Sequence, residues 1–145
     1  MIKTVHKDKK MKTLPTDLKI IDTIYERYYT TFASFSEDAK NRNNKIYVPI
    51  DVKIIADDLG VDPDIIFGRL YYDLDQKYRY EQPDGSTVHF FARQLNEDHN
   101  CVNFPYMASV LSKLREENKK YRIATTLAIV SLFVSAVALL ISIFV

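Results

Sequence analysis

The chain has 145 residues, enough for one domain of ordinary size, and its 20 lysines and arginines nearly balance its 19 acidic residues. Its one cysteine, Cys101, excludes an internal disulfide and fits a reducing compartment. The charges are nevertheless segregated, because residues 1–12 hold five lysines against one aspartate, whereas residues 45–98 hold six cations against eleven acids. We therefore expect an acidic central domain behind a basic flexible tail over residues 1–15, and Met11 offers an alternative start.

The first part of the domain is predicted to hold one long helix and one short strand. Apolar side chains recur at helical spacing over residues 17–35, which predicts an amphipathic helix that Thr16 or Asp17 caps. A polar loop over residues 36–44 follows, and then a strand over residues 45–50.

Two shorter helices joined by a tight turn come next. Asp51 and Gly60 are typical of the residues that bound a helix, here one over residues 52–59. Asp62 is then expected to cap a second helix that begins at Pro63 and runs to about residue 77. The apolar residues predicted to form its buried stripe are Ile66, Leu70 and Leu74.

The end of the domain is predicted to be a hairpin followed by a polar crossing. Tyrosines alternate with charged residues from residue 77 onward, Pro83–Ser86 is a strong turn signal, and Thr87–Phe91 is the expected return strand. Residues 93–103 are expected to form a polar crossing that leads to Pro105 and a long helix.

This order of helix, strand, helix, turn, helix and hairpin resembles the winged-helix family of helix-turn-helix domains over residues 17–92. Ala56, Gly60 and Ile66 match the family's small residue in the first helix, its turn glycine and its buried apolar residue in the second. The resemblance implies that Pro83–Ser86 is the tip of the wing.

The match has one departure. Arg69 stands where the commonest helix-turn-helix pattern has an apolar residue, and Leu70 takes that place one position later. The expected fold class is α+β: a small winged-helix domain over residues 16–103 whose long C-terminal helix forms a juxtamembrane segment over residues 104–122 and continues into a single transmembrane helix over residues 123–145.

The transmembrane prediction rests on residues 123–145, which contain no charge, asparagine, glutamine, glycine or proline. At about 1.5 Å rise per residue this segment can cross a hydrocarbon core of roughly 30 Å. A basic cluster precedes it, so the positive-inside rule places the N-terminal domain in the cytosol and makes the protein a single-pass, tail-anchored protein, expected in a bacterial inner membrane. The cations that set this topology and contact membrane lipid are Lys113, Arg115, Lys119, Lys120 and Arg122.

Small residues follow one side of the predicted membrane helix. They are spaced four, three, four, three and four residues apart, and such a seam lets two helices approach closely in lipid. The same register extends backward to Met107. The seam predicts a homodimer or pairing with another protein's helix; chance placement, with Met107 packed on its own domain, is the alternative. Its members are Ala124, Ala128, Ser131, Ser135, Ala138 and Ser142.

The second helix of the motif is where DNA reading would be expected, because that helix enters the major groove in the family. Its sequence opens with Asp62 and Asp64, and a carboxylate at a helix N-terminus takes the place where a phosphate binds. This charge favours a protein partner over DNA. The candidate contact residues for either ligand are Arg69, Tyr72, Lys77, Arg79 and His89.

No catalytic or cofactor motif stands out. His99 and Cys101 lack the further ligands that a metal site needs, and Cys101 is expected to be a structural thiol. We therefore expect no enzyme activity, no metal and no cofactor. The preferred hypothesis is a membrane-anchored adaptor or regulator that binds a protein partner; the alternatives are a membrane-tethered transcription regulator and a small membrane-perturbing effector.

Overall fold

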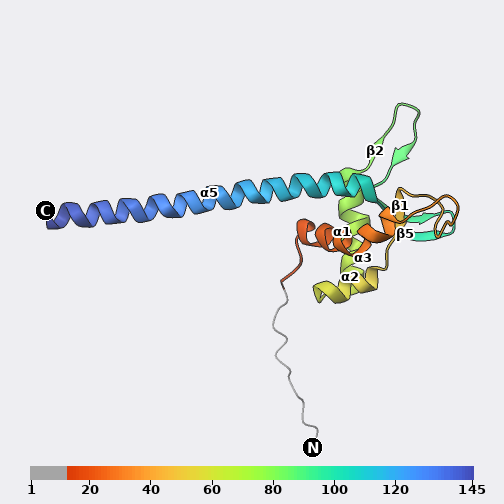
Figure 1. Ribbon diagram of the computed structural model, residues 1–145, viewed down its shortest axis with the longest axis horizontal. Coiled ribbons are helices and arrows are strands. Elements are labelled where there is room, and N and C mark those ends of the chain that lie inside the picture. The colour runs from red at the N-terminus through yellow and green to blue at the C-terminus, as the bar shows by residue number, and fades with distance from the viewer. Residues whose placement is uncertain (1–12) are drawn as a thin grey trace, which may run out of the picture. The chain divides into compact units, whose positions relative to one another are not determined.

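The computed structural model describes residues 13–145, so most of the expected basic tail and the alternative start at Met11 lie outside the described residues. The chain divides into two compact units, Met1–Ser109 and Val110–Val145. The first unit is a mixed domain of helices and small antiparallel sheets, and the second is the remainder of one long helix, which ends in an apolar stretch (Figure 1). The α+β class with a long apolar C-terminal helix is thereby confirmed.

Helix α1 (Asp17–Ala33) begins where the capping signal predicted. The Thr16 hydroxyl accepts a hydrogen bond from the Lys19 amide at 3.2 Å, which satisfies one of the amides that a helix start leaves open. The apolar side of the helix is fully buried at Ile20, Ile21 and Ile24. Strand β1 (Tyr47–Pro49) follows after the polar loop.

The two predicted helices joined by a tight turn are also present. Helix α2 (Val52–Leu59) is capped by Asp51, whose carboxylate accepts from the amides of residues 53 and 54. Gly60 ends the helix at φ 67°, a left-handed conformation that glycine adopts without a Cβ clash. Helix α3 (Pro63–Gly68) then begins after its Asp62 cap, as predicted.

Helix α3 continues without a break through η1 (Arg69–Leu74) and α4 (Asp75–Tyr78). Segment η1 is π-helical, and the Asp75 amide donates to the carbonyl of Leu70, five residues earlier. The predicted stripe of Ile66, Leu70 and Leu74 is fully buried. A stripe at every fourth residue drifts around an α-helix of about 3.6 residues per turn, and the wider turn in η1 opposes that drift. Leu70, and not Arg69, takes the buried place.

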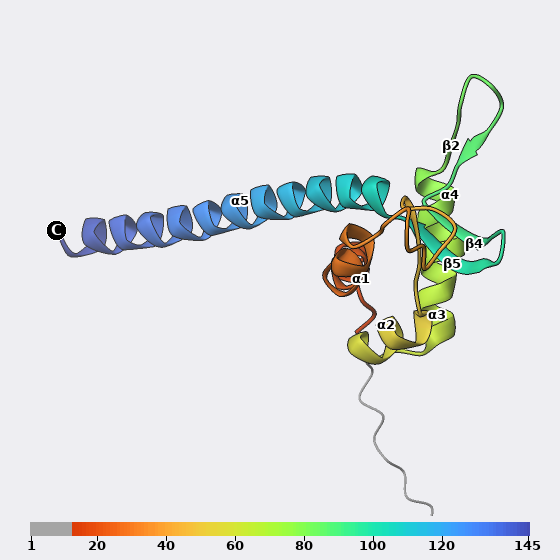
Figure 2. The same ribbon diagram turned by 45° about the vertical axis from the view of Figure 1, so that its right-hand side comes forward.

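The predicted hairpin is present but shorter. Strand β2 (Tyr80–Glu81) pairs with β3 (Thr87–Val88), so Tyr78 belongs to α4 and the return strand ends before Phe91. The turn residue Gly85 has a φ of 85°. In both views this hairpin projects away from the helices and from the larger sheet of the first unit (Figure 2).

The predicted polar crossing over residues 93–103 forms a second hairpin, which the sequence analysis did not predict. Strand β4 (Phe91–Leu95) pairs with β5 (Asp98–Asn103), and Leu95 lies opposite Asp98, so the loop has two residues. Asn96 has a φ of 54°, the left-handed conformation that tight hairpin turns require and that asparagine tolerates. The strand β5 also pairs with β1, which gives an antiparallel sheet in the order β1-β5-β4.

Aromatic contacts join the helices to the sheet of the first unit. The ring of Phe104 stacks on Phe32 and Tyr25 of α1 with centroids 4.7 and 5.5 Å away, and Phe67 of α3 meets Phe91 of β4 edge-on at 6.0 Å. These contacts leave Phe91 and Phe104 essentially without exposed surface. The core therefore lies between the helices and the three-stranded sheet.

Helix α5 (Phe104–Phe144) has 41 residues and begins within the first unit. An 18-residue window of it has a mean hydropathy of 2.8, and none of that window is buried. By length and composition it can cross a membrane. Met107 is fully buried in the first unit, so it packs on its own domain, as the alternative to the extended seam held.

Candidate functional site

The five predicted contact residues lie along one helix and the hairpin that follows it. Arg69 and Tyr72 belong to η1, Lys77 belongs to α4, and Arg79 is the residue at which α4 ends. His89 lies between β3 and β4. The structure brings Arg79 and His89 together around a carboxylate that the sequence analysis did not single out, whereas the other three point elsewhere.

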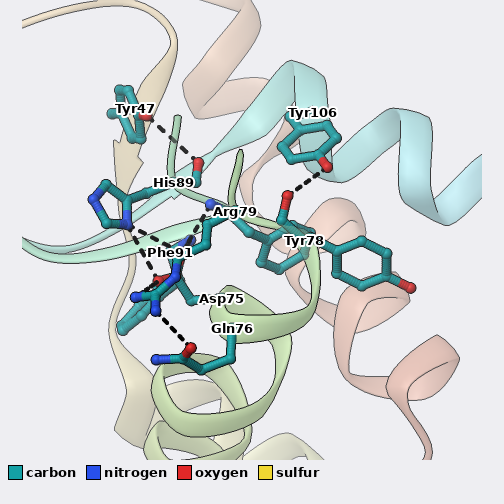
Figure 3. A network of polar contacts seen from close by, with 9 residues as sticks. Tyr47, Asp75, Gln76, Tyr78, Arg79, His89, Phe91 and Tyr106 are labelled. Carbon is teal, nitrogen blue, oxygen red and sulfur yellow. Dashed lines mark hydrogen bonds and ion pairs between the residues drawn. The ribbon is translucent and has the colours of Figure 1, made fainter. Parts of the chain in front are cut away.

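That carboxylate belongs to Asp75, which is 3% exposed (Figure 3). Its Oδ1 accepts hydrogen bonds from the backbone amides of Phe90 and Phe91 at 2.9 and 3.1 Å. The His89 Nδ1 lies 3.2 Å from Oδ2, and the Arg79 guanidinium lies 4.0 Å from the same oxygen. A buried carboxylate needs such partners to offset its lost hydration. Asp75 therefore fastens the end of the helix to the start of β4.

Two tyrosine hydroxyls complete this polar network. The Tyr106 hydroxyl donates to the carbonyl of Tyr78 at 2.7 Å, and burial raises the pKa of the Tyr106 phenol above its usual range. The Tyr47 hydroxyl donates to the carbonyl of His89 at 3.4 Å. Both bonds hold the backbone on either side of the β2–β3 hairpin (Figure 3). The network therefore has a structural role, since it holds the backbone at both ends of the hairpin. Within it, the His89 side chain is 38% exposed.

Arg69 is held by its own domain. Its guanidinium forms an ion pair with Asp17 at the start of α1, lies 3.3 Å from the Asp73 carboxylate, and donates to the carbonyl of Pro15 at 3.3 Å. Opposite charges and hydrogen bonds of this kind fix a guanidinium in one orientation. The Arg69 side chain thus links η1 to the start of α1, and it does not point outward as a base-reading arginine would.

Tyr72 has 71% of its surface accessible. Its ring meets Phe67 and Tyr71 edge-on, with centroids 6.4 and 5.0 Å away. Lys77 lies over the Tyr78 ring at 5.3 Å, a cation–π geometry that keeps its ammonium group close to its own helix. Tyr72 is therefore an aromatic side chain that η1 exposes on its outward side.

The membrane-proximal residues lie on the second unit. All six seam residues are exposed. The Ser135 hydroxyl donates to the carbonyl of Ser131 at 2.9 Å, and the Ser142 hydroxyl donates to that of Leu139 at 2.7 Å, so these two hydroxyls are satisfied within the helix. The five cations before the seam are also exposed, and Lys120 forms an ion pair with Glu116 at 2.9 Å.

Cys101 is fully buried on β5, which confirms the expectation of a structural thiol. Burial, with a smaller effect from Asp98, raises the pKa of this thiol from its usual 9.0 to about 11. A protonated thiol is a poor nucleophile. Within residues 13–145, no group of three or more His, Cys, Asp or Glu side chains could hold a metal ion.

Comparisons of this chain with protein-family models, with curated proteins and with solved structures give no match. The assignment of a function therefore rests on the geometry of these residues.

We predict that Asp75→Ala lowers the free energy of unfolding by about 3 kcal/mol, because it leaves two buried amides without an acceptor. His89→Ala removes only a partly exposed partner, so it should cost less than about 1 kcal/mol. Urea unfolding of the full chain in a neutral detergent, followed by tyrosine near-UV circular dichroism, measures both. Equal losses would show that the amide contacts do not carry the network.

The Cys101 pKa predicts a loss of stability at alkaline pH. Below pH 9 the thiol is protonated in both states; between 9 and about 11 the unfolded state loses the proton while the folded state keeps it, so the free energy of unfolding falls as pH rises. Cys101→Ala should flatten this decline. Urea unfolding of both proteins between pH 8 and pH 10.5 tests it, and parallel curves would contradict it. A thiol reagent at pH 8 should label Cys101 only after denaturation.

Proposed function

We propose that the chain is a membrane-anchored adaptor whose α+β domain is a winged helix that binds a protein partner on the cytosolic side of the membrane. The observation that carries the choice of protein over DNA is the engagement of Arg69 by Asp17, Asp73 and Pro15. Arg69 was one of the candidate contact residues, and its Nη1 and Nη2 atoms already donate to acceptors of its own domain.

The order of the elements supports the winged-helix part of the proposal. Three helices and a strand precede a hairpin, and β1 pairs with that hairpin in one antiparallel sheet. The hairpin in question is β4–β5 and not β2–β3. The proposal therefore places the wing tip at Asn96 and Glu97 instead of Pro83–Ser86, and it treats β2–β3 as an insertion between the motif's second helix and the sheet.

The charge of the motif's second helix supports a protein partner. Asp62, Asp64 and Asp73 lie exposed on or beside it, whereas DNA binding depends on cations that neutralise phosphates. Of its two cations, Arg69 is engaged and Lys77 lies over the Tyr78 ring. Ile65 and Tyr72 are exposed on this helix. Exposed tyrosine is typical of protein interfaces, where it is enriched.

Helix α5 supports the membrane part of the proposal. Its apolar stretch is long enough to span a bilayer, and the exposed cations between residues 113 and 122 precede that stretch. This arrangement favours a cytosolic position for the domain. Anionic headgroups would attract the same cations.

The proposal predicts that the full chain in neutral nanodiscs shows no salt-sensitive binding to mixed-sequence DNA duplexes, measured by fluorescence anisotropy at 50 and 200 mM salt. A DNA reader with several phosphate contacts would lose affinity by about 10³-fold or more over this range. Binding of that kind, abolished in Arg69→Ala, would replace the adaptor by a tethered DNA-binding regulator.

The same preparation tests the partner surface with a matched pair of exposed tyrosines. A partner recovered with the wild-type chain should be lost with Tyr72→Glu and retained with Tyr29→Glu, since Tyr72 lies on η1 and Tyr29, 49% exposed, lies on α1. Equal recovery with both variants would place the partner surface elsewhere on the domain.

The anchor predicts that the full chain stays with membranes after carbonate washing, and that removal of residues 123–145 releases the domain into the soluble fraction. A protease added to sealed vesicles should cut the domain only when the cytosolic face is outward. Release of the full chain by carbonate, or cleavage in the opposite vesicle orientation, would contradict the anchor or its direction.

A further inference from the structure

A shallow hollow lies on helix α5 where its charged part meets its apolar stretch. Its lining residues are Arg122, Ile123, Thr126 and Leu127, and its volume is about 230 Å³. The Thr126 hydroxyl donates to the carbonyl of Arg122 at 2.9 Å, so this hydroxyl is satisfied within the helix. The hollow is therefore cationic at one end and apolar at the other. Its volume is below the roughly 300–1,000 Å³ of a pocket that encloses a whole small molecule, so it suits one part of a larger ligand.

Lys119 adds a second cation on the same side of the helix. It precedes Arg122 by three positions and Ile123 by four, which are the spacings of neighbouring side chains on a helix surface. Lys120, the next residue, lies about 100° further around the helix and forms an ion pair with Glu116 at 2.9 Å. The cationic end of the hollow is thus formed by Lys119 and Arg122, both of which are exposed.

The place of these two cations matches the headgroup region of a bilayer that α5 crosses. Lys119 lies only roughly 6 Å of helix rise before Ile123, where the apolar stretch begins. Long cationic side chains at the end of a membrane helix extend toward the headgroups. A guanidinium binds phosphate oxygens through paired hydrogen bonds, and an ammonium group adds a second positive charge. A phosphate held there would leave its apolar tail beside Ile123 and Leu127.

A headgroup with a net negative charge fits the two cations better than a zwitterionic one. Phosphatidylcholine carries a phosphate, but its own ammonium group would add a third positive charge beside Lys119 and Arg122. Phosphatidylglycerol carries the same phosphate with an uncharged glycerol and avoids this repulsion. The matching ligand class is therefore an anionic phospholipid.

We propose that this side of α5 holds one anionic phospholipid, with its phosphate on Lys119 and Arg122 and an acyl chain along Ile123 and Leu127. The site rests on the membrane anchor of the proposed function. It goes beyond a general attraction of headgroups to the basic cluster, because it assigns the lipid to one side of the helix and to two of the five cations.

Helix pairing along the small-residue seam would leave this site open to lipid. Two positions along an α-helix correspond to a rotation of about 200°, so Ala124 lies nearly opposite Arg122, and Ala128 lies nearly opposite Thr126. The seam and the lipid site therefore use different sides of one helix, and each chain of a pair would keep its own lipid.

Native mass spectrometry tests the site on the full chain released from nanodiscs of equal phosphatidylglycerol and phosphatidylcholine, because it identifies the lipids that stay bound. We expect the chain to retain phosphatidylglycerol in preference. Lys119→Gln and Arg122→Gln should each lower the retained ratio roughly five-fold, and the matched control Lys120→Gln, which removes the same charge on another side, by less than about two-fold. Equal losses in all three variants would show diffuse attraction by the whole cluster and overturn the site.

A second pair of variants tests the hollow without a change of charge. The hydroxyls of Thr125 and Thr126 each donate to the carbonyl four residues earlier at 2.9 Å, but the two side chains lie about 100° apart around the helix. Thr126→Phe should fill the hollow and lower the retention of phosphatidylglycerol, whereas Thr125→Phe should leave it unchanged. The same retention in both variants would overturn the part of the proposal that seats the acyl chain in the hollow.

Inorganic phosphate distinguishes a lipid site from a site for free phosphate. Added to the nanodiscs, it should not displace phosphatidylglycerol, because it makes no contact with Ile123 and Leu127; displacement would overturn the lipid assignment. Carbonate washing separates this inference from the anchor on which it rests. A chain that stays in the membrane but shows no preference for phosphatidylglycerol would refute the lipid site alone, whereas a chain that carbonate releases would refute both.

Discussion

The spacing of four residues between Ile66, Leu70 and Leu74 is the constraint on which the rest of the first unit depends. In a regular α-helix this stripe would rotate by about 80° around the axis between its first and last members, toward the edge of a buried face. The wider π-helical turn in η1 opposes this rotation, and all three residues are buried. The same turn fixes where the neighbours go: Arg69 faces α1, Tyr72 faces outward, and Asp75 arrives beneath the start of β4. Wide turns of this kind occur often at functional sites.

Asp75, at the end of that helix, fixes the position of the chain that follows the hairpin. Eleven residues, 79–89, lie between α4 and the buried pair Phe90 and Phe91, and all of them are exposed or half-buried. A two-stranded hairpin has little stability of its own. Because the Asp75 carboxylate bonds both amides of that pair, the return of the chain to the core does not depend on the hairpin's own pairing. The hairpin can therefore project from the domain while β4 keeps its register with β5.

Local signals in the sequence predicted the helices well, because each helix start is set by one side chain and the amides next to it. Thr16, Asp51 and Asp62 all cap as expected. The β4–β5 hairpin escaped prediction because its polar residues lack a glycine or proline at the turn, and Asn96 alone adopts the left-handed conformation there. The partners of Arg69 were equally hidden, since Asp17 lies 52 positions away in the sequence. Pairing across such distances depends on the fold and leaves no local pattern.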